Sequence, residues 1–194
     1  MPNYRRAYVR GGTFFFTVVT YNRRPIFTNP IAQILLGRAI RKCQREWPFE
    51  INAIVLLPDH LHTIWTLPRG DDRYSARWSI IKKGFTSRYR NAGGREASVT
   101  RAQYKAGRAG VWQPRFWEHS LEDEDDFEAH FDYIHFNPVR HRYVECPQDW
   151  SPSSFHRWVR KGVYDPNWAC GNYPAPDFSK LEDSCGEPVE FPVK

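Results

Sequence analysis

The pattern of apolar and polar positions along the chain predicts an alternation of strands and helices. Short runs rich in aromatic and β-branched residues, typical of strands, cover residues 13–20, 50–57, 61–67 and 115–121. Stretches with apolar residues three and four positions apart, typical of helices, cover residues 30–47, 75–90 and 122–137, with a shorter one at 153–160. The predicted order is therefore β-α-β-β-α-β-α, followed by a short helix.

Particular residues set the predicted helix boundaries. Pro30 stands at the start of the first helix and Pro48 beyond its end, where a proline stops a helix. The third helix opens in the acidic run 122–126, whose carboxylates complement the positive end of the helix dipole. It is expected to end near Asn137 and Pro138.

This order predicts an α+β domain in which helices pack on an antiparallel sheet, a ferredoxin-like or split βαβ layout. Residues 91–110 are rich in glycine, alanine and basic side chains without apolar periodicity, and we interpret them as a mobile basic loop. Residues 151–194 form an irregular C-terminal tail in this interpretation, after a single domain at 1–150. Such folds carry many functions, so the function must be argued from the site.

The composition is that of a globular protein, with 41% hydrophobic and 26% charged residues. The formal net charge is +6, and a basic domain attracts polyanions, of which nucleic acid is the first candidate. A solvated basic surface explains the charge equally well. Aromatic residues reach 16%, enough to build a core and to leave some rings for stacking on bases.

The four cysteines are widely spaced and include no CxxC pair, which favours reduced thiols over a zinc site or a disulfide framework. The first ten residues are polar and basic, and no stretch is apolar enough for a membrane span. We therefore expect a cytoplasmic protein without a membrane partner.

Two histidines form the first candidate for chemistry. His60 and His62 lie two residues apart in a predicted strand, where alternate side chains share a face, so both imidazoles project together and can bind one divalent ion. Leu61 and Trp65 then face the opposite, packed side. Two ordinary polar histidines on a half-exposed strand would give the same pattern.

The predicted third helix carries the second candidate. His130, Tyr133 and Asn137 fall on one flank, beside the apolar stripe of Phe127, Phe131 and Ile134. Tyr133 and Asn137 are one turn apart, which places a phenol next to an amide that can bind a metal. The alternative is a partly buried tyrosine with Asn137 capping the helix before a proline.

Together these residues resemble a known family. His60-Leu61-His62 is similar to the His-hydrophobic-His motif of the HUH endonuclease superfamily. Within it, several blocks in the same order resemble the REP-associated tyrosine transposases, relatives of the single-tyrosine transposases of the insertion-sequence 200/605 type. These blocks are residues 11–18, 49–53, 57–62, 65–68, 112–119 and 132–139.

The resemblance implies a function and a site. Residues 1–150 become an HUH single-tyrosine transposase domain, a single-stranded-DNA endonuclease and strand transferase that cuts beside REP hairpins through a 5′-phosphotyrosine. Tyr133 matches the nucleophile, His60 and His62 the metal-binding histidines, and Asn137 the polar third ligand. The metal is expected to be Mg²⁺ or Mn²⁺, with zinc ranked third. Relatives in this group include monomers and homodimers, so both states remain open.

Other residues are weaker candidates. His130 and His119 are candidates for a general acid–base group, although a structural or DNA-contacting role explains them better. The basic residues that could bind DNA phosphates are Arg5, Arg6, Arg10, Arg77, Lys82, Lys83 and Arg88. For each, a solvated surface charge is the alternative.

Two other functions compete with the transposase. A catalytically inactive or domesticated protein that binds hairpin DNA would keep the basic surface but would not need all four residues of the candidate site. A replication or conjugation initiator of the HUH type would require a larger chain than 194 residues.

Overall fold

The computed structural model describes residues 8–171, 176–178, 181 and 185–186. Its sheet has four antiparallel strands in the order β2-β3-β1-β4, the arrangement of a split βαβ fold. The strands are β1 (Thr13–Val19), β2 (Glu50–Leu56), β3 (His60–Thr66) and β4 (Trp117–Ser120). The helices are α1 (Pro30–Glu46), α2 (Tyr74–Asn91), α3 (Arg101–Lys105), α4 (Glu124–Arg140) and α5 (Phe155–Arg160). Short 3₁₀ turns occur at Tyr21–Arg23, Ile26–Thr28 and Pro147–Asp149.

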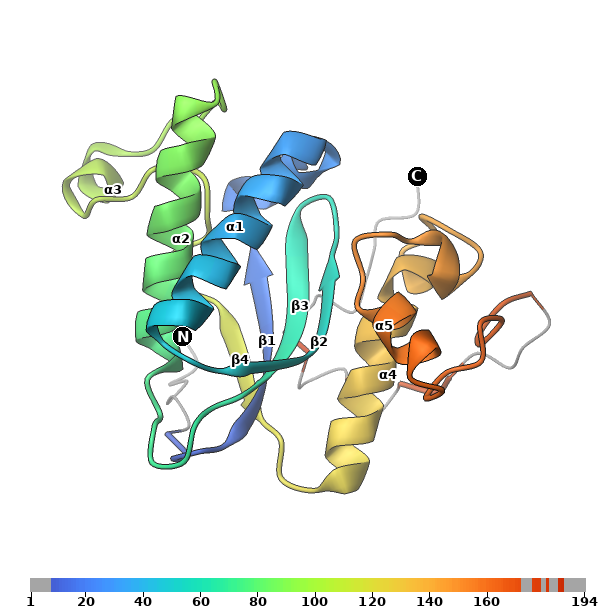
Figure 1. The fold of residues 1–194 in the computed structure, drawn as a ribbon. Coiled ribbons are helices and arrows are strands. Elements are labelled where there is room, and N and C mark those ends of the chain that lie inside the picture. The colour runs from blue at the N-terminus through green and yellow to red at the C-terminus, as the bar shows by residue number, and fades with distance from the viewer. Residues whose placement is uncertain (1–7, 172–175, 179–180, 182–184, 187–194) are drawn as a thin grey trace.

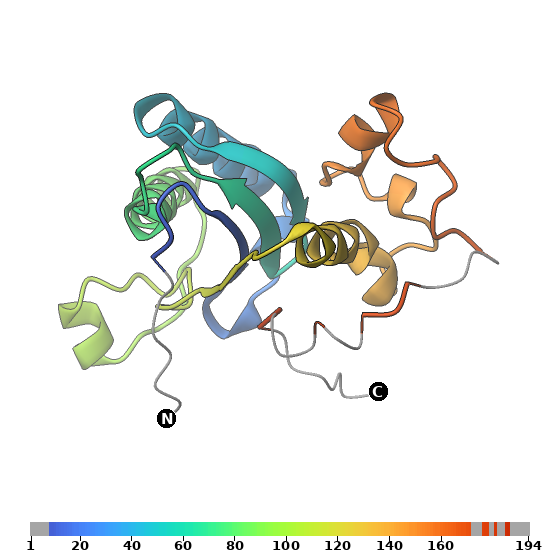
Figure 2. The ribbon, with the colours of Figure 1, turned by 90° about the horizontal axis from the view of Figure 1, so that it is seen from below.

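The sheet is covered on both faces (Figures 1 and 2). On one face α1 and α2 pack over Phe14, Phe16 and Trp65, whose side chains are fully buried. On the other face α4 packs over Phe15 and Ile64. Successive side chains of a strand point to opposite faces of the sheet. Alternate residues of β1 and β3 therefore belong to the core under α1 and α2 and to the core under α4.

The second core also includes the chain after residue 150. Phe155 of α5, together with Tyr164, Leu181 and Cys185, is buried in the same cluster as Phe131 of α4. The described residues of the predicted tail are irregular apart from α5. They pack against the sheet's α4 face, so this tail contributes to the stability of the domain.

The sequence explains where α1 and α4 begin. The Asn29 side chain accepts a hydrogen bond from the Ile31 N–H, and Pro30 occupies the first helical position, where no N–H is needed. The Asp123 side chain caps α4 by accepting from the Asp126 N–H, and three further acidic residues follow in the first turn. This capping fixes the start of the helix that carries Tyr133.

The α+β fold predicted from the sequence is confirmed, with two local corrections. The 91–110 segment is not irregular throughout, because a capping box of Thr100 and Gln103 starts the short helix α3 within it. In addition, α4 does not end at Pro138 but continues to Arg140. Pro138 lies inside the helix and is buried, although a proline cannot donate a backbone hydrogen bond there.

The expectation of four reduced thiols is wrong for two of the cysteines. Cys146 and Cys170 form a disulfide that links the end of the α4 region to the segment after α5. Widely spaced cysteines gave no local signal of this pairing, since it depends on how the tail folds back. Cys43 and Cys185 are buried thiols.

None of the helices in the described part of the chain combines the length and the apolar character needed to cross a membrane.

Candidate active site

Strand β3 places two imidazoles side by side on the α4 face of the sheet. His60 lies opposite Val19 of β1 and His62 lies opposite Thr17, and both histidines are fully buried. Their ring centroids are 4.9 Å apart. Leu61 is buried in the core on the other face, so the alternation expected from the sequence is confirmed.

The partners of the Nδ1 atoms fix which ring nitrogens can bind a metal. His60 Nδ1 lies 2.5 Å from the Asp59 carboxylate, which can only accept, so this nitrogen carries the proton. The Thr17 hydroxyl donates its proton to the Cys185 carbonyl and therefore accepts from His62 Nδ1, at 2.9 Å. In neutral imidazoles the lone pairs then reside on the two Nε2 atoms, the arrangement of metal-binding histidines with oriented rings.

Asp59 is held as a carboxylate. Burial raises its pKa, but the hydrogen bond from His60, together with the Arg23 guanidinium 3.0 Å away, outweighs burial and brings the pKa below its usual value. In the sequence Asp59 is simply the residue before His60. Its role as the hydrogen-bond partner of a candidate ligand becomes visible only from the structure.

Helix α4 carries both Tyr133, which contacts His62, and Asn137. The Tyr133 ring packs edge-on against the His62 ring, with centroids 5.4 Å apart. Asn137, one turn later, is fully buried, and within the described part of the chain neither atom of its amide has a hydrogen-bond partner. A buried amide without partners costs roughly 1–3 kcal/mol, and binding of a metal ion by its oxygen would offset this cost.

Two residues near the end of α4 join this group, although sequence reasoning did not single them out. The Arg140 guanidinium donates to the Tyr133 hydroxyl at 2.5 Å. The His141 ring lies 5.3 Å from the His60 ring. Both follow Tyr133 at helical spacings, seven and eight residues later, which is the signal that could have identified them.

The C-terminal segment covers the candidate nucleophile. The Phe178 ring lies edge-on to Tyr133 at 5.5 Å, and the Cys185 carbonyl reaches Thr17. Together with Phe15 and His62, which also pack against its ring, Phe178 leaves Tyr133 only 2% exposed.

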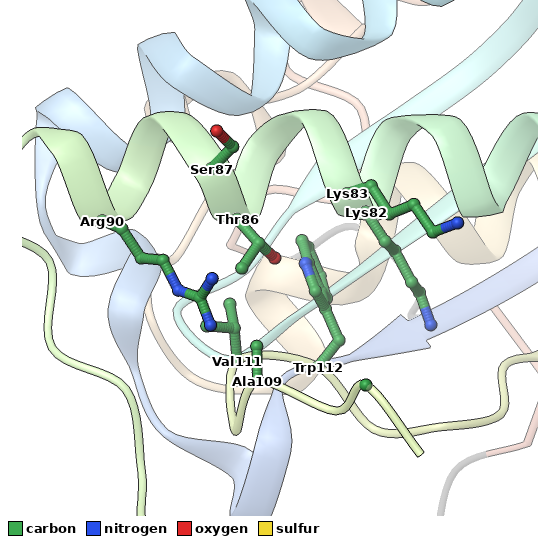
Figure 3. Close-up of a pocket in the computed structure, with 9 residues that line it drawn as sticks. Lys82, Lys83, Thr86, Ser87, Arg90, Ala109, Val111 and Trp112 are labelled. Carbon is green, nitrogen blue, oxygen red and sulfur yellow. The ribbon is translucent and has the colours of Figure 1, made fainter. Parts of the chain in front are cut away.

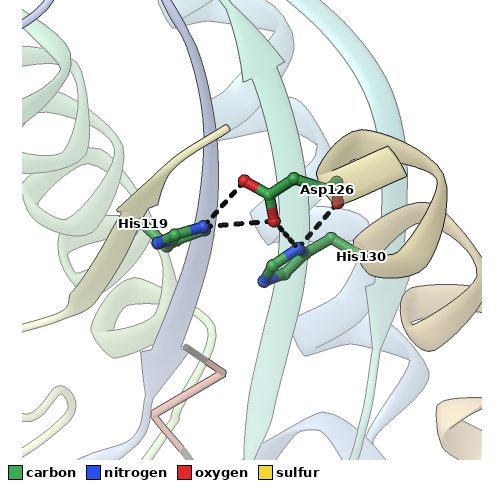
Figure 4. A group of neighbouring side chains, drawn as sticks. All are labelled: His119, Asp126 and His130. Atoms are coloured by element: carbon green, nitrogen blue, oxygen red, sulfur yellow. Dashed lines mark hydrogen bonds and ion pairs between the residues drawn. The ribbon is translucent and has the colours of Figure 1, made fainter. Parts of the chain in front are cut away.

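His119 and His130 meet at Asp126, beside the group just described (Figure 4). His119 Nε2 lies 2.9 Å from the Asp126 carboxylate, and His130 Nδ1 lies 2.9 Å from the same carboxylate and 2.9 Å from the Asp126 carbonyl. Burial lowers the pKa of His130 despite the neighbouring carboxylate. Their donor atoms lie within 4.8 Å of one another, as in a metal site.

Hydrogen bonding accounts for this cluster without a metal. The Asp126 oxygens accept from His119 Nε2 and His130 Nδ1, so both nitrogens carry protons and would have to lose them to bind an ion. Asp126 also accepts from the Glu122 N–H at the start of α4. We therefore interpret this cluster as a tie between β4 and α4.

The basic residues proposed to bind DNA differ in their surroundings. Lys82 and Lys83 line a pocket of about 250 Å³, and Lys82 and Arg90 extend from α2 toward Val111 and Trp112 (Figure 3). Its cations and its apolar floor suit a nucleotide or a phosphate backbone. The segment expected to be a loop supplies part of this pocket.

Arg77 must be removed from the DNA-binding candidates. It is 1% exposed, and its guanidinium donates to the Asp71 carboxylate and to the Trp47 and Pro48 carbonyls. Helical spacing suggested a solvated face, but the packing of α2 against α1 turns this residue inward. The pKa of Asp71 lies well below its usual value because of hydrogen bonds from Arg77 and Arg73.

The remaining basic candidates lie elsewhere. The Arg10 side chain is 78% exposed. Arg88 donates to the Gly84 carbonyl within its own helix. Arg5 and Arg6 lie outside the described residues.

Comparisons with known proteins identify the family of this chain. Residues 9–137 match the family described as "Transposase IS200 like". The chain is 46% identical to a REP-associated tyrosine transposase of Escherichia coli (strain K12), over 87% of this chain and 92% of the relative. It is 40% identical to a putative REP-associated tyrosine transposase of Haemophilus influenzae, over 87% and 93%.

A solved structure extends the similarity to the fold. It is described as a REP-associated tyrosine transposase bound to a REP hairpin, and it superposes with a TM-score of 0.77 at 42% identity, over 98% of this chain and 100% of that one. The chain belongs to the IS200-like transposase family, as a REP-associated tyrosine transposase.

Proposed function

We propose that this transposase cuts single-stranded DNA beside a REP-type hairpin and rejoins it through a covalent 5′-phosphotyrosine at Tyr133. His60, His62 and Asn137 are the proposed ligands of a divalent metal ion. The relative of known structure is bound to a REP hairpin, which supports the same class of DNA as the partner of this chain. Both a monomer and a homodimer are compatible with the proposal.

One observation carries it. A phenol from α4 packs against one of two adjacent imidazoles on β3, and a buried amide follows one turn later on the same helix. This arrangement supports the proposal, because His60 and Asn137 are 77 positions apart in the sequence.

The donor set fits a divalent ion. Two Nε2 atoms, oriented through Asp59 and Thr17, and the amide oxygen of Asn137 provide two nitrogen ligands and one oxygen ligand. Such a mixed set suits Mn²⁺, and Mg²⁺ is the abundant alternative. When bound, the ion would polarise the scissile phosphate and offset its negative charge.

The residues of the chain account for the rest of the reaction. The Tyr133 oxygen attacks the scissile phosphorus, forms the phosphotyrosine bond and displaces the 3′-oxygen of the neighbouring nucleotide. The phenol loses its proton and the departing 3′-oxygen gains one. Because the covalent link conserves the energy of the phosphodiester, a second 3′-hydroxyl can attack it and join a new strand without ATP.

The experiment that tests this proposal is adduct formation on a labelled hairpin oligonucleotide in the presence of Mn²⁺. We expect a protein–DNA adduct that survives SDS, and we expect Tyr133→Phe to abolish it while hairpin binding persists. Tyr104→Phe is the matched control, because Tyr104 is 75% exposed on α3. An adduct formed by Tyr133→Phe would show that the nucleophile is assigned wrongly.

Metal dependence is tested separately. His60→Ala should lose metal-dependent cutting and keep a folded domain, as judged by circular dichroism. Equal cutting by the wild-type protein with and without EDTA would remove the metal from the mechanism.

One observation favours a second function, that of a hairpin-binding protein without activity. Tyr133 is only 2% exposed under the C-terminal segment, so a protein that never moved this segment would bind DNA without cutting it. Absence of any adduct, with hairpin binding intact, would support this alternative.

A further inference from the structure

The Arg140 side chain contacts the candidate nucleophile Tyr133, and the proposed reaction assigns it no role. It follows Tyr133 by seven residues, two turns further along α4. Two turns of helix rise about 10 Å, and helical side chains lean toward the N-terminus. A long arginine side chain can therefore reach back along the helix to the phenol. Its guanidinium donates to the Tyr133 oxygen at 2.5 Å and lies 5.2 Å from the centre of the tyrosine ring.

We propose that Arg140 is a second catalytic residue, which holds the Tyr133 oxygen in place and stabilises its negative charge in both steps of the reaction. This inference rests on the proposed function of Tyr133. It adds a residue that contacts the reacting atom itself.

The charge on this oxygen changes twice. In cleavage the oxygen loses its proton and bonds to phosphorus as the P–O3′ bond breaks. In strand transfer a 3′-hydroxyl loses its proton and attacks the phosphotyrosine, the P–O bond to Tyr133 breaks, and the phenolic oxygen takes the electron pair of that bond and then a proton. A guanidinium donating to this oxygen stabilises the negative charge in both directions, since a hydrogen bond to a charged group is about twice as strong as a neutral one.

The buried surroundings of Tyr133 strengthen the stabilisation of its negative charge by Arg140. Tyr133 is 2% exposed and its ring lies between Phe15, His62 and Phe178. Where water is excluded, a fixed cation interacts more strongly with a developing negative charge than it would in solvent. The position of Arg140 on the same rigid helix as Tyr133 keeps the two groups in register.

The test measures the two steps separately in single-turnover experiments with saturating hairpin oligonucleotide and Mn²⁺. Arg140→Ala should slow adduct formation about 100-fold, the effect of removing one donor from a developing oxyanion. Release of the purified adduct by a strand with a 3′-hydroxyl should slow by a similar factor. Hairpin affinity should stay within about two-fold of wild type, because the residue acts on the reacting oxygen and not on binding.

Arg140→Lys and added guanidinium ion separate chemistry from folding. Guanidinium, at concentrations far below those that unfold proteins, should restore part of the rate of Arg140→Ala. Arg140→Lys should keep an intermediate rate, because it retains the charge and loses the planar geometry. Arg160→Ala is the matched control, since Arg160 is exposed at the end of α5, and its rates should equal those of wild type.

The outcomes distinguish the two proposals. A normal rate in Arg140→Ala, or a loss of hairpin affinity with an unchanged saturated rate, overturns the role of Arg140 while the adduct still depends on Tyr133. A rate loss in Arg140→Ala that guanidinium does not restore, with Arg140→Lys equally slow, also overturns it, because the loss is then structural. An adduct that persists in Tyr133→Phe overturns both proposals.

Discussion

A buried histidine on α4 makes the stability of this transposase depend on pH in a way that can be calculated. His135 is fully buried, and its two ring nitrogens contact the Tyr164 hydroxyl at 3.1 Å and the Ser154 hydroxyl at 2.8 Å. The Tyr164 hydroxyl donates to the Asp132 carboxylate, so it accepts from His135 Nδ1. The ring is therefore neutral in the folded protein, with its proton on Nδ1.

Burial, assisted by the charge of Arg157, lowers the pKa of His135 from 6.5 to about 3. In the unfolded chain the ring takes up a proton near pH 6.5, whereas in the fold it does so only near pH 3. The unfolded state thus binds more protons across this interval, and stability falls as the pH falls from about 6.5 toward 3. Each pH unit costs about 1.4 kcal/mol, so lowering the pH from 7 to 5 costs about 2 kcal/mol through this residue.

Urea unfolding of wild type and His135→Gln at pH 7 and pH 5 measures this effect. Glutamine can keep both hydrogen bonds without titrating, and the carboxylates shared by the two proteins cancel in the comparison. With a denaturant slope of about 2 kcal/mol per molar, the wild-type midpoint should fall by about 1 M more than that of the variant. Equal pH dependence of the two proteins would refute the assignment of a neutral, buried His135.

Two further predictions follow from the packing around the site. Phe178→Ala removes an aromatic contact of about 1 kcal/mol from the segment over Tyr133, so adduct formation should accelerate roughly five-fold at saturating hairpin. An unchanged rate would mean that opening of this segment does not limit the reaction. Arg77→Met should destabilise the protein by about 3 kcal/mol, because it breaks a buried ion pair. Arg73→Ala, the matched control with a 61% exposed side chain on the same Asp71, should cost less than about 1 kcal/mol. Thermal unfolding of the two variants checks this difference, and equal losses would contradict it.

Much of this structure was predictable because its signals are local. Strand alternation placed His60 and His62 on one face and Leu61 on the other, and the acidic run before Tyr133 marked the start of α4. These features depend on periodicity and capping, which a single sequence shows directly.

Other features depend on contacts between distant parts of the chain. Thr17 meets His62 only through the register of β1 and β3, and the Cys185 carbonyl that orients Thr17 comes from the far end of the sequence. Arg77 looked solvated because a charged residue on an amphipathic helix usually is. Its burial follows from the position of Asp71 and the carbonyls before β2.

The α4 helix shows how these local and distant features combine. Its Tyr133 and Asn137 face β3, while Asp132 and His135, on a neighbouring flank, belong to the network with Tyr164 and Ser154. Successive residues of a helix are 100° apart about its axis. A shift of α4 by one residue would therefore turn Tyr133 away from His62. The buried hydrogen bonds of His135 thus fix the rotation of the helix about its axis. We expect protonation of the His135 ring, which occurs only near pH 3 in the folded protein, to impair Tyr133 before the domain unfolds as a whole, so that adduct formation declines at a higher pH than helix content does.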